Sequence, residues 1–217
     1  MYEMPEVLVR YAVEQAGGTV SYNGDNGVTT VVLDGRTAYL RAGSDGAYIV
    51  NGRLVIKAEK LARKLYGEGY RESQWHQFVP KEGQSFDRAL DAVLAFSSWY
   101  GPASRNNKLE YGASINKYGE NDYRLEDIKS SDDNEAVFDP QYNERRVPVV
   151  IKSNTRAIIH THWHPQGSLK HSGGDIFNFP NQLNGYPNLD YSYVVNRYNE
   201  IYVMSRWYKE SVRSSQL

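Results

Sequence analysis

The sequence contains no cysteine in its 217 residues. This absence excludes disulfide bonds, zinc sites built from thiolates and catalysis by a cysteine nucleophile. The sequence also lacks a surplus of charge of either sign, because 25 lysine and arginine residues nearly balance 26 aspartate and glutamate residues. A nearly neutral chain argues against nucleic acid or an anionic membrane as its partner.

Long apolar runs are absent as well, since no stretch approaches the run of about 18 apolar residues that a transmembrane helix needs. The N-terminus, M-Y-E-M-P-E-V, has neither the basic nor the apolar region of a signal peptide. The 18 tyrosines, in contrast, are many, as in extracellular β proteins. We therefore expect a secreted or cell-surface setting, reached as part of a longer chain or by another export route.

The order of helix, strand and turn signals predicts two domains. Residues 1–67 predict a small α+β domain with a helix over 5–16, ended by two glycines, and a second helix over 57–66. Strands are expected between these helices, over residues 19–22, 28–34, 36–41 and 47–50. Residues 68–84 are polar, contain glycine and proline, and predict a linker to a second domain over 85–217.

The second domain is expected to begin with a helix capped by Ser85 and stopped near Tyr100 by a Gly-Pro pair. The polar segment 129–146 predicts a solvated loop. The remaining pattern predicts strands over residues 110–116, 122–128, 147–151 and 156–164 and a final hairpin over 191–196 and 201–204. This order indicates a mixed α/β domain.

Four of the five histidines lie within residues 157–176. Side chains of a strand alternate between its two faces, so His160, His162 and His164 are expected to share one face with Ile158. Three imidazoles in a row are unsuited to an apolar core. This arrangement therefore indicates a functional site.

An aspartate follows these histidines at the start of a predicted helix. Ser172 is the expected N-cap, and Asp175 falls in the first turn, where a carboxylate suits the helix dipole. Histidine nitrogen and carboxylate oxygen are zinc ligands, and a catalytic zinc keeps a fourth position open. The strand end and the helix start together predict a three-ligand zinc site.

The motif H-x-H-P, six residues and then S-x-x-D resembles the core signature of the JAMM (JAB/MPN-type) metallopeptidases. Here it reads His162-Trp163-His164-Pro165, followed by Ser172-Gly173-Gly174-Asp175. The family also requires an upstream glutamate on a strand that follows a helix, and Glu110 fits that place. The segment from about Phe86 to Met204 is similar to a bacterial JAB-related domain, of uncharacterised function, that recurs in secreted and toxin-like proteins.

The resemblance implies a fold, a cofactor and residue roles. The fold would be the JAMM/deaminase-like mixed sheet flanked by helices, and Zn²⁺ would be held by His162, His164 and Asp175. Glu110 would take a proton from the attacking water and return it to the leaving amine. Ser172 would donate to the tetrahedral oxyanion, although a helix N-cap is an equally good reading of this residue.

Two histidine pairs remain open as zinc ligands. His160-Thr161-His162 is a second H-x-H, and with it the loop to Ser172 would be two residues longer than in the family. We favour His162 and His164, because the following proline and the loop length both fit. His171 is expected to be a solvated loop residue, or otherwise a contact for substrate.

Residues 1–67 resemble the small α/β repeat domain called copper amine oxidase N-terminal-like. The segments V-E-Q-A-G-G-T-V-S-Y and A-Y-I-V-N-G-R carry this likeness. That domain is common in secreted proteins of Gram-positive bacteria, so the likeness implies a surface- or cell-wall-associated module. The segment shows no copper ligands, and no copper chemistry is expected of it.

These features predict a zinc metallopeptidase or isopeptidase that hydrolyses an amide bond, delivered as a secreted toxin or effector domain. Its partners would be a protein or peptide substrate and, for a toxin, an immunity protein. One alternative is a catalytically silent JAMM-like binding or scaffold module. Another is a metal-dependent nuclease that uses the histidine cluster, which the neutral charge balance disfavours.

Overall fold

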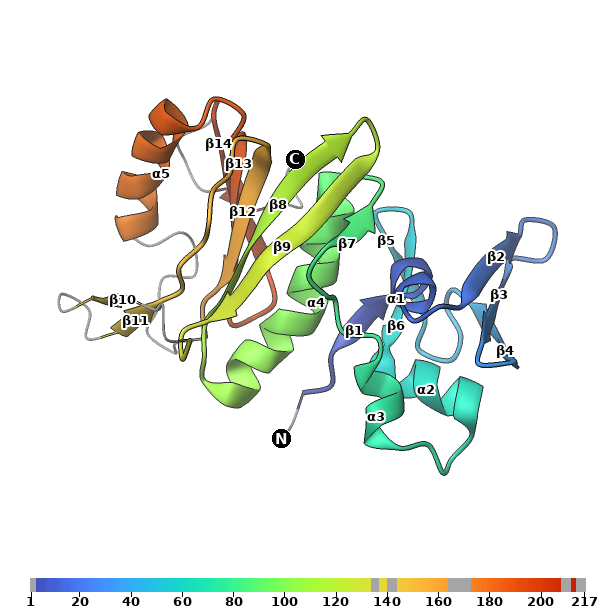
Figure 1. Cartoon of the computed structure of the whole chain (residues 1–217). Coiled ribbons are helices and arrows are strands. Elements are labelled where there is room, and N and C mark those ends of the chain that lie inside the picture. The colour runs from blue at the N-terminus through green and yellow to red at the C-terminus, as the bar shows by residue number, and fades with distance from the viewer. Residues whose placement is uncertain (1–2, 134–136, 140–143, 164–172, 208–211, 214–217) are drawn as a thin grey trace. The chain divides into compact units, whose positions relative to one another are not determined.

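The chain forms two compact units, Met1–Pro80 (unit 1) and Lys81–Leu217 (unit 2), which are described separately. The structure is a computed structural model (Figure 1). It describes residues 3–133, 137–139, 144–163, 173–207 and 212–213. None of the described helices is both long enough and apolar enough to cross a membrane.

Unit 1 contains two three-stranded antiparallel sheets and three helices. One sheet has the order β1 (Glu6–Leu8), β6 (Arg53–Lys57) and β5 (Tyr48–Val50). The other has the order β2 (Thr19–Asn23), β3 (Val28–Leu33) and β4 (Arg36–Arg41). The helices are α1 (Val9–Gln15), α2 (Ala58–Tyr66) and α3 (Glu72–His76). Helix α1 lies between the two sheets and contacts both (Figure 1).

The first predicted helix is shorter than expected, because residues 6–8 form a strand. Val7 pairs with Ile56 of β6, and both side chains are buried. Strand β6 was not predicted, although a two-residue Asn-Gly turn joins it to β5. Asn51 and Gly52 have φ of 48° and 78°, the left-handed conformation that such a hairpin turn requires.

The predicted linker, residues 68–84, is not an extended connection. It contains α3, and the border between the two units falls after Pro80. Trp75 and Phe78 are 5% and 1% exposed, so two aromatic side chains anchor this segment in unit 1. The polar composition of the segment led to the prediction of a linker. The burial of two aromatic rings is nevertheless enough to hold a short segment against the protein.

Unit 2 is built on a seven-stranded mixed sheet with the order β15-β14-β13-β12-β8-β9-β7. Strands β12 and β13 are parallel, and the other neighbours are antiparallel. The strands are β7 (Gln84–Phe86), β8 (Tyr111–Gly119), β9 (Asp122–Ser130), β12 (Thr155–Thr161), β13 (Tyr191–Val195), β14 (Ile201–Ser205) and β15 (Val212–Arg213). The expected mixed α/β architecture is therefore confirmed for this unit.

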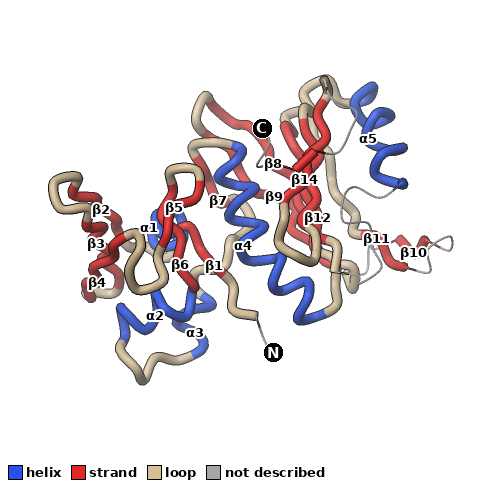
Figure 2. The backbone as a smooth tube through the Cα atoms, turned by 180° about the vertical axis from the view of Figure 1, so that it is seen from behind, coloured by secondary structure: helices blue, strands red, loops and turns tan. Residues whose placement is uncertain are grey.

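Two helices cover opposite faces of this sheet, as Figures 1 and 2 show. Helix α4 (Ala89–Asn107) packs on β7, β8, β9, β12 and β13. Helix α5 (Gly173–Gly185) covers the other face, where Phe179 and Leu183 pack with Ile158, Leu189 and Met204. Each face of the central strand β12 thus meets a different helix.

Helix α4 begins later and ends later than expected. Residues 84–86 form strand β7, in which Ser85 hydrogen-bonds Asp122, so Ser85 is not a helix cap. The helix starts beside the Arg88 guanidinium, which donates twice to the fully buried Asp91 carboxylate at 2.7 and 3.1 Å. The helix then continues through the buried Pro102. Proline has no backbone N–H and removes one helical hydrogen bond, but packing against the sheet outweighs this loss.

Two further segments differ from expectation. Residues 129–146, predicted to be a loop, contain the end of β9 and a two-stranded sheet of β10 (Val137–Asp139) and β11 (Glu144–Arg146). Residues 147–151 were predicted to be a strand but have no strand assignment. They run over the sheet instead, with Val149 and Ile151 packed against the core between the sheet and α5.

Candidate metal centre

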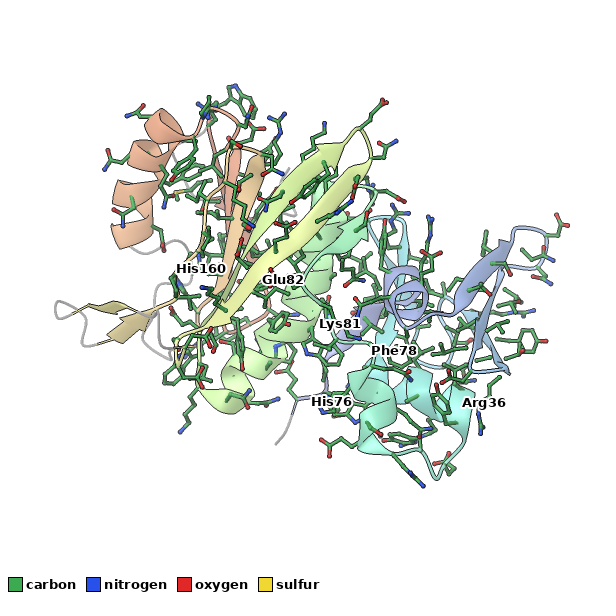
Figure 3. The ribbon with its side chains drawn as sticks, in the orientation of Figure 1. Arg36, His76, Phe78, Lys81, Glu82 and His160 are labelled. Atoms are coloured by element: carbon green, nitrogen blue, oxygen red, sulfur yellow. The ribbon has the colours of Figure 1, made fainter. Side chains whose placement is uncertain are left out.

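Strand β12 carries His160 on the face that α5 covers. Ile158 of the same strand lies in the core with Phe179 of α5, and His160 follows two positions later (Figure 3). His162 comes directly after the strand, with its ring beside that of His160. Thr161 points to the opposite face, where its hydroxyl donates to Ser104 of α4 at 3.0 Å. The predicted alternation is therefore confirmed for Ile158, His160 and Thr161, whereas His164 lies outside the described residues.

His160, His162 and Asp175 come together at the edge of the α5-covered face. The two Nε2 atoms of the histidines lie 3.0 Å apart. Carboxylate oxygens of Asp175 lie 3.5 Å from His160 Nε2 and 3.8 Å from His162 Nε2. One donor atom from each residue falls within 4.8 Å of the others, so this group could hold a metal ion.

The separations are close to those between the ligands of one ion. A zinc ion with ligand bonds of about 2.0–2.1 Å separates its ligand atoms by about 3.3–3.4 Å. The distance between the two Nε2 atoms, 3.0 Å, is shorter than this value, and the distances of 3.5 and 3.8 Å, which go to different oxygens of Asp175, are longer. The side chains of His160 and His162 are 14% and 11% exposed, and that of Asp175 is 24% exposed. The donors are thus mostly sheltered from solvent.

The position of Asp175 follows from local sequence. Helix α5 starts at Gly173, which places the Asp175 carboxylate in its first turn, as predicted. A carboxylate is stabilised there by the positive end of the helix dipole. The described part of the chain thus brings a helix start to the end of β12 and completes the group of three donors.

Glu110 lies on the neighbouring strand connection, immediately before β8. The β8–β12 ladder pairs His160 with Gly112, and the Tyr111 amide donates to the Thr161 hydroxyl at 2.9 Å. Gly112 and His160 form the last pair of this ladder, and Glu110 lies two residues before Gly112, just outside β8. Glu110 is therefore two residues along the chain from the partner of His160.

A short segment covers the sheet beside His160. Gly112, the partner of His160 in the register, has no side chain, and a Cβ there would meet Val147 Cγ1 at 2.7 Å and Val149 Cγ2 at 3.0 Å. We call residues 147–152 the strap. Val147 and Val149 of the strap form an apolar surface over Gly112, the partner of His160, and nothing in the sequence pattern pointed to this contact.

The far end of the strap is fixed by ion pairs. Lys152 Nζ lies 2.9 Å from carboxylate oxygens of both Glu126 and Asp127 on β9. Burial alone would raise the pKa of Glu126, but hydrogen bonds from Tyr118, Lys152 and Asn116 outweigh burial and lower this pKa. The same two carboxylates raise the pKa of Lys152. The strap is thus held by a charged contact at one end and by apolar packing at the other.

The other residues singled out in the sequence divide into two groups. His164, His171 and Ser172 lie outside the described residues. His76 lies on α3, half exposed, with its ring 3.3 Å from Glu72 (Figure 3). Among the described residues, His160 and His162 lie together with Asp175, whereas the pair of His162 and His164 stays a prediction.

Comparison with protein-family models, with curated proteins and with solved structures found no match to this chain.

Proposed function

We propose that unit 2 is a zinc-dependent hydrolase that cleaves amide bonds, a peptidase or isopeptidase of the JAMM type. The observation that carries this proposal is the convergence of His160, His162 and Asp175, whose donor atoms lie within 4.8 Å of one another. Two histidines and one carboxylate leave a fourth position open, as catalytic zinc sites require. We assign His160, rather than His164, as the first ligand.

The three donors would hold the ion, and a bound zinc would act as a Lewis acid that lowers the pKa of coordinated water from 15.7 to about 7. Glu110, just before β8, has the chemistry of the general base, because its carboxylate can accept a proton from the attacking water. The same carboxyl would then deliver that proton to the leaving amine nitrogen. Asp175, in the first turn of α5, would supply the third ligand and offset part of the charge of the ion.

Strand pairing holds both histidines in place. His160 is fixed between β8 and β13, since β12 pairs with both strands. The His162 amide donates to the Val195 carbonyl at 2.8 Å, which extends the β12–β13 pairing beyond the strand's end. A pair of imidazoles held close together by strand pairing needs only a small rearrangement to bind the ion, which favours tight binding.

Metal content tests the ligand assignment directly. Untagged protein purified without chelators is expected to contain about one zinc per chain by mass spectrometry, and His160→Ala, His162→Ala and Asp175→Asn are expected to lose it. His164→Ala is expected to keep its zinc, as is the matched control His76→Ala, which changes an exposed histidine of unit 1.

Activity is tested on the zinc-loaded protein with a peptide library read by mass spectrometry. Glu110→Gln is expected to keep the zinc and lose activity by roughly 100-fold or more, the usual contribution of a general base. Wild-type protein that binds no zinc even when zinc is added back would overturn the proposal. Equal zinc content in His160→Ala and wild type would overturn the ligand assignment.

A further inference from the structure

Unit 1 contains a groove that the proposed chemistry of unit 2 does not use. Its cavity of about 830 Å³ is bordered by α1, by strands β2 and β5, and by the start of β6. The floor is apolar and includes Val20 and Leu54. Tyr22 and Ile49, on the two bordering strands, are 69% and 55% exposed. Large apolar groups that gather at an open groove indicate a binding surface.

The charged residues of the groove are mainly basic. Arg10, Arg41 and Arg53 line it together with a single carboxylate, that of Glu14. Unit 1 as a whole holds 9 basic and 9 acidic residues over 1–80, so the excess of positive charge is local to the groove. Guanidinium groups bind carboxylates through paired hydrogen bonds, which makes an anionic ligand the complementary one.

The arginines are held in place at the groove. The guanidinium carbons of Arg10 and Arg53 lie 5.9 and 5.5 Å from the centre of the Tyr11 ring. This ring is 5% exposed and therefore rigid, and it orders two flexible cations at one point. Arg10 also pairs with Glu14 at 3.1 Å. Ordered guanidinium groups lose less entropy when they bind a ligand.

The strands that border the groove favour an extended peptide. Strand β2 pairs with β3 alone among the described strands, and β5 pairs with β6 alone. Each therefore turns one backbone edge away from its own sheet, and such edges are templates for an added strand. Val20 and Tyr22 stand two residues apart on β2 and line the groove, so they would contact alternate side chains of a peptide.

We propose that this groove binds an acidic peptide segment in an extended conformation, with its carboxylates at the three arginines and its apolar side chains on Val20, Ile49 and Leu54. Unit 1 is then a recognition module for acidic, partly apolar peptide segments. This assignment is independent of the metal chemistry of unit 2, and it is tested separately by peptide binding.

The test is fluorescence anisotropy on the full chain with a labelled peptide that alternates glutamate with leucine. A second peptide, with lysine in place of each glutamate, is the charge control. We expect saturable binding of the acidic peptide that weakens as salt is raised, and no saturable binding of the basic peptide. Arg41→Glu is expected to weaken binding at least tenfold. Its matched control is Arg36→Glu, an exposed arginine outside the groove lining, which is expected to bind as wild type does.

Ile49→Ser provides a second variant that leaves every charge in place, and we expect it to weaken binding several-fold. Three results would each overturn the proposal: no saturable binding of the acidic peptide, equal loss in Arg41→Glu and Arg36→Glu, or equal affinity for dextran sulfate per charge. The last result would mean that the groove attracts polyanions in general and recognises no peptide. Circular dichroism of each variant verifies that it is folded.

Discussion

The contact between Gly112 and the strap leads to a sharp prediction. A methyl group at this position, in Gly112→Ala, would lie 2.7 Å from Val147 Cγ1 and 3.0 Å from Val149 Cγ2. Carbon atoms in favourable contact are about 3.5–4.0 Å apart, so Val147 must move by about 0.8–1.3 Å and Val149 by about 0.5–1 Å. Valine has stiff χ1 preferences and no flexible end, so the strap backbone has to shift with it.

Overpacking of this kind costs about 1–3 kcal/mol in a well-packed core. We expect Gly112→Ala to lower the free energy of unfolding of unit 2 by that amount. The matched control is Gly185→Ala at the end of α5, where a Cβ meets nothing within 4 Å. Alanine is the better helix former by up to about 1 kcal/mol, so this control is expected to be neutral or stabilising.

The assay is urea denaturation of both variants and wild type, followed by a probe of unit 2 such as near-ultraviolet circular dichroism. Because the chain has two units, each transition is fitted separately. Gly112→Ala is also expected to weaken zinc binding, since the strap lies beside His160. If Gly112→Ala and Gly185→Ala unfold at the same urea concentration, the strap does not rest on Gly112 and the reasoning is refuted.

Three further outcomes are expected. Glu126→Gln should reduce the stability of unit 2 by an amount that is constant above about pH 5. The pKa of Glu126 is lower in the folded protein than in the unfolded chain, where it is about 4.3. The ionised carboxylate therefore stabilises the fold fully above the unfolded pKa, and this stabilisation is lost as the pH falls through the folded pKa. The difference between variant and wild type should accordingly shrink below about pH 4. Thr161→Val should cost about 1–3 kcal/mol in urea denaturation, because the Tyr111 amide loses its acceptor and the Ser104 hydroxyl loses a donor. Lys152→Met should lower stability by less than about 1 kcal/mol at 1 M salt and by more at low salt, since its side chain is 41% exposed and salt screens its ion pairs.

Features with a local cause were predictable. The alternation of His160 and His162 along a strand follows from the period of two that every strand imposes. The placement of Asp175 in the first turn of a helix follows from the glycines and the carboxylate at the helix start. Strands β2 to β5 of unit 1 and the final hairpin were predictable for the same reason, because alternating apolar residues and turn residues act within a few positions, whereas β1 and β6 were missed.

Other features could not be predicted, because they depend on contacts between distant segments. Helix α4 continues through Pro102 since the sheet buries that turn, and no local signal reports this packing. The segment around Trp75 is polar in composition, and only the buried side chain shows that it belongs to unit 1. The strap was predicted to be a strand, because its apolar valines fit a sheet as well as they fit the surface over Gly112.

The sequence by itself determined that histidines line one face of a strand and that a carboxylate begins the next helix, because both follow from backbone periodicity. Only the tertiary structure shows that His160 and His162 lie beside that carboxylate, since this depends on where α5 docks on the sheet. It also shows that His160 pairs with Gly112, two residues after Glu110, because strand register is set by pairing between segments about 50 residues apart. The sequence shows which side chains are available for a site, whereas the packing of helices on the sheet decides which of them come together.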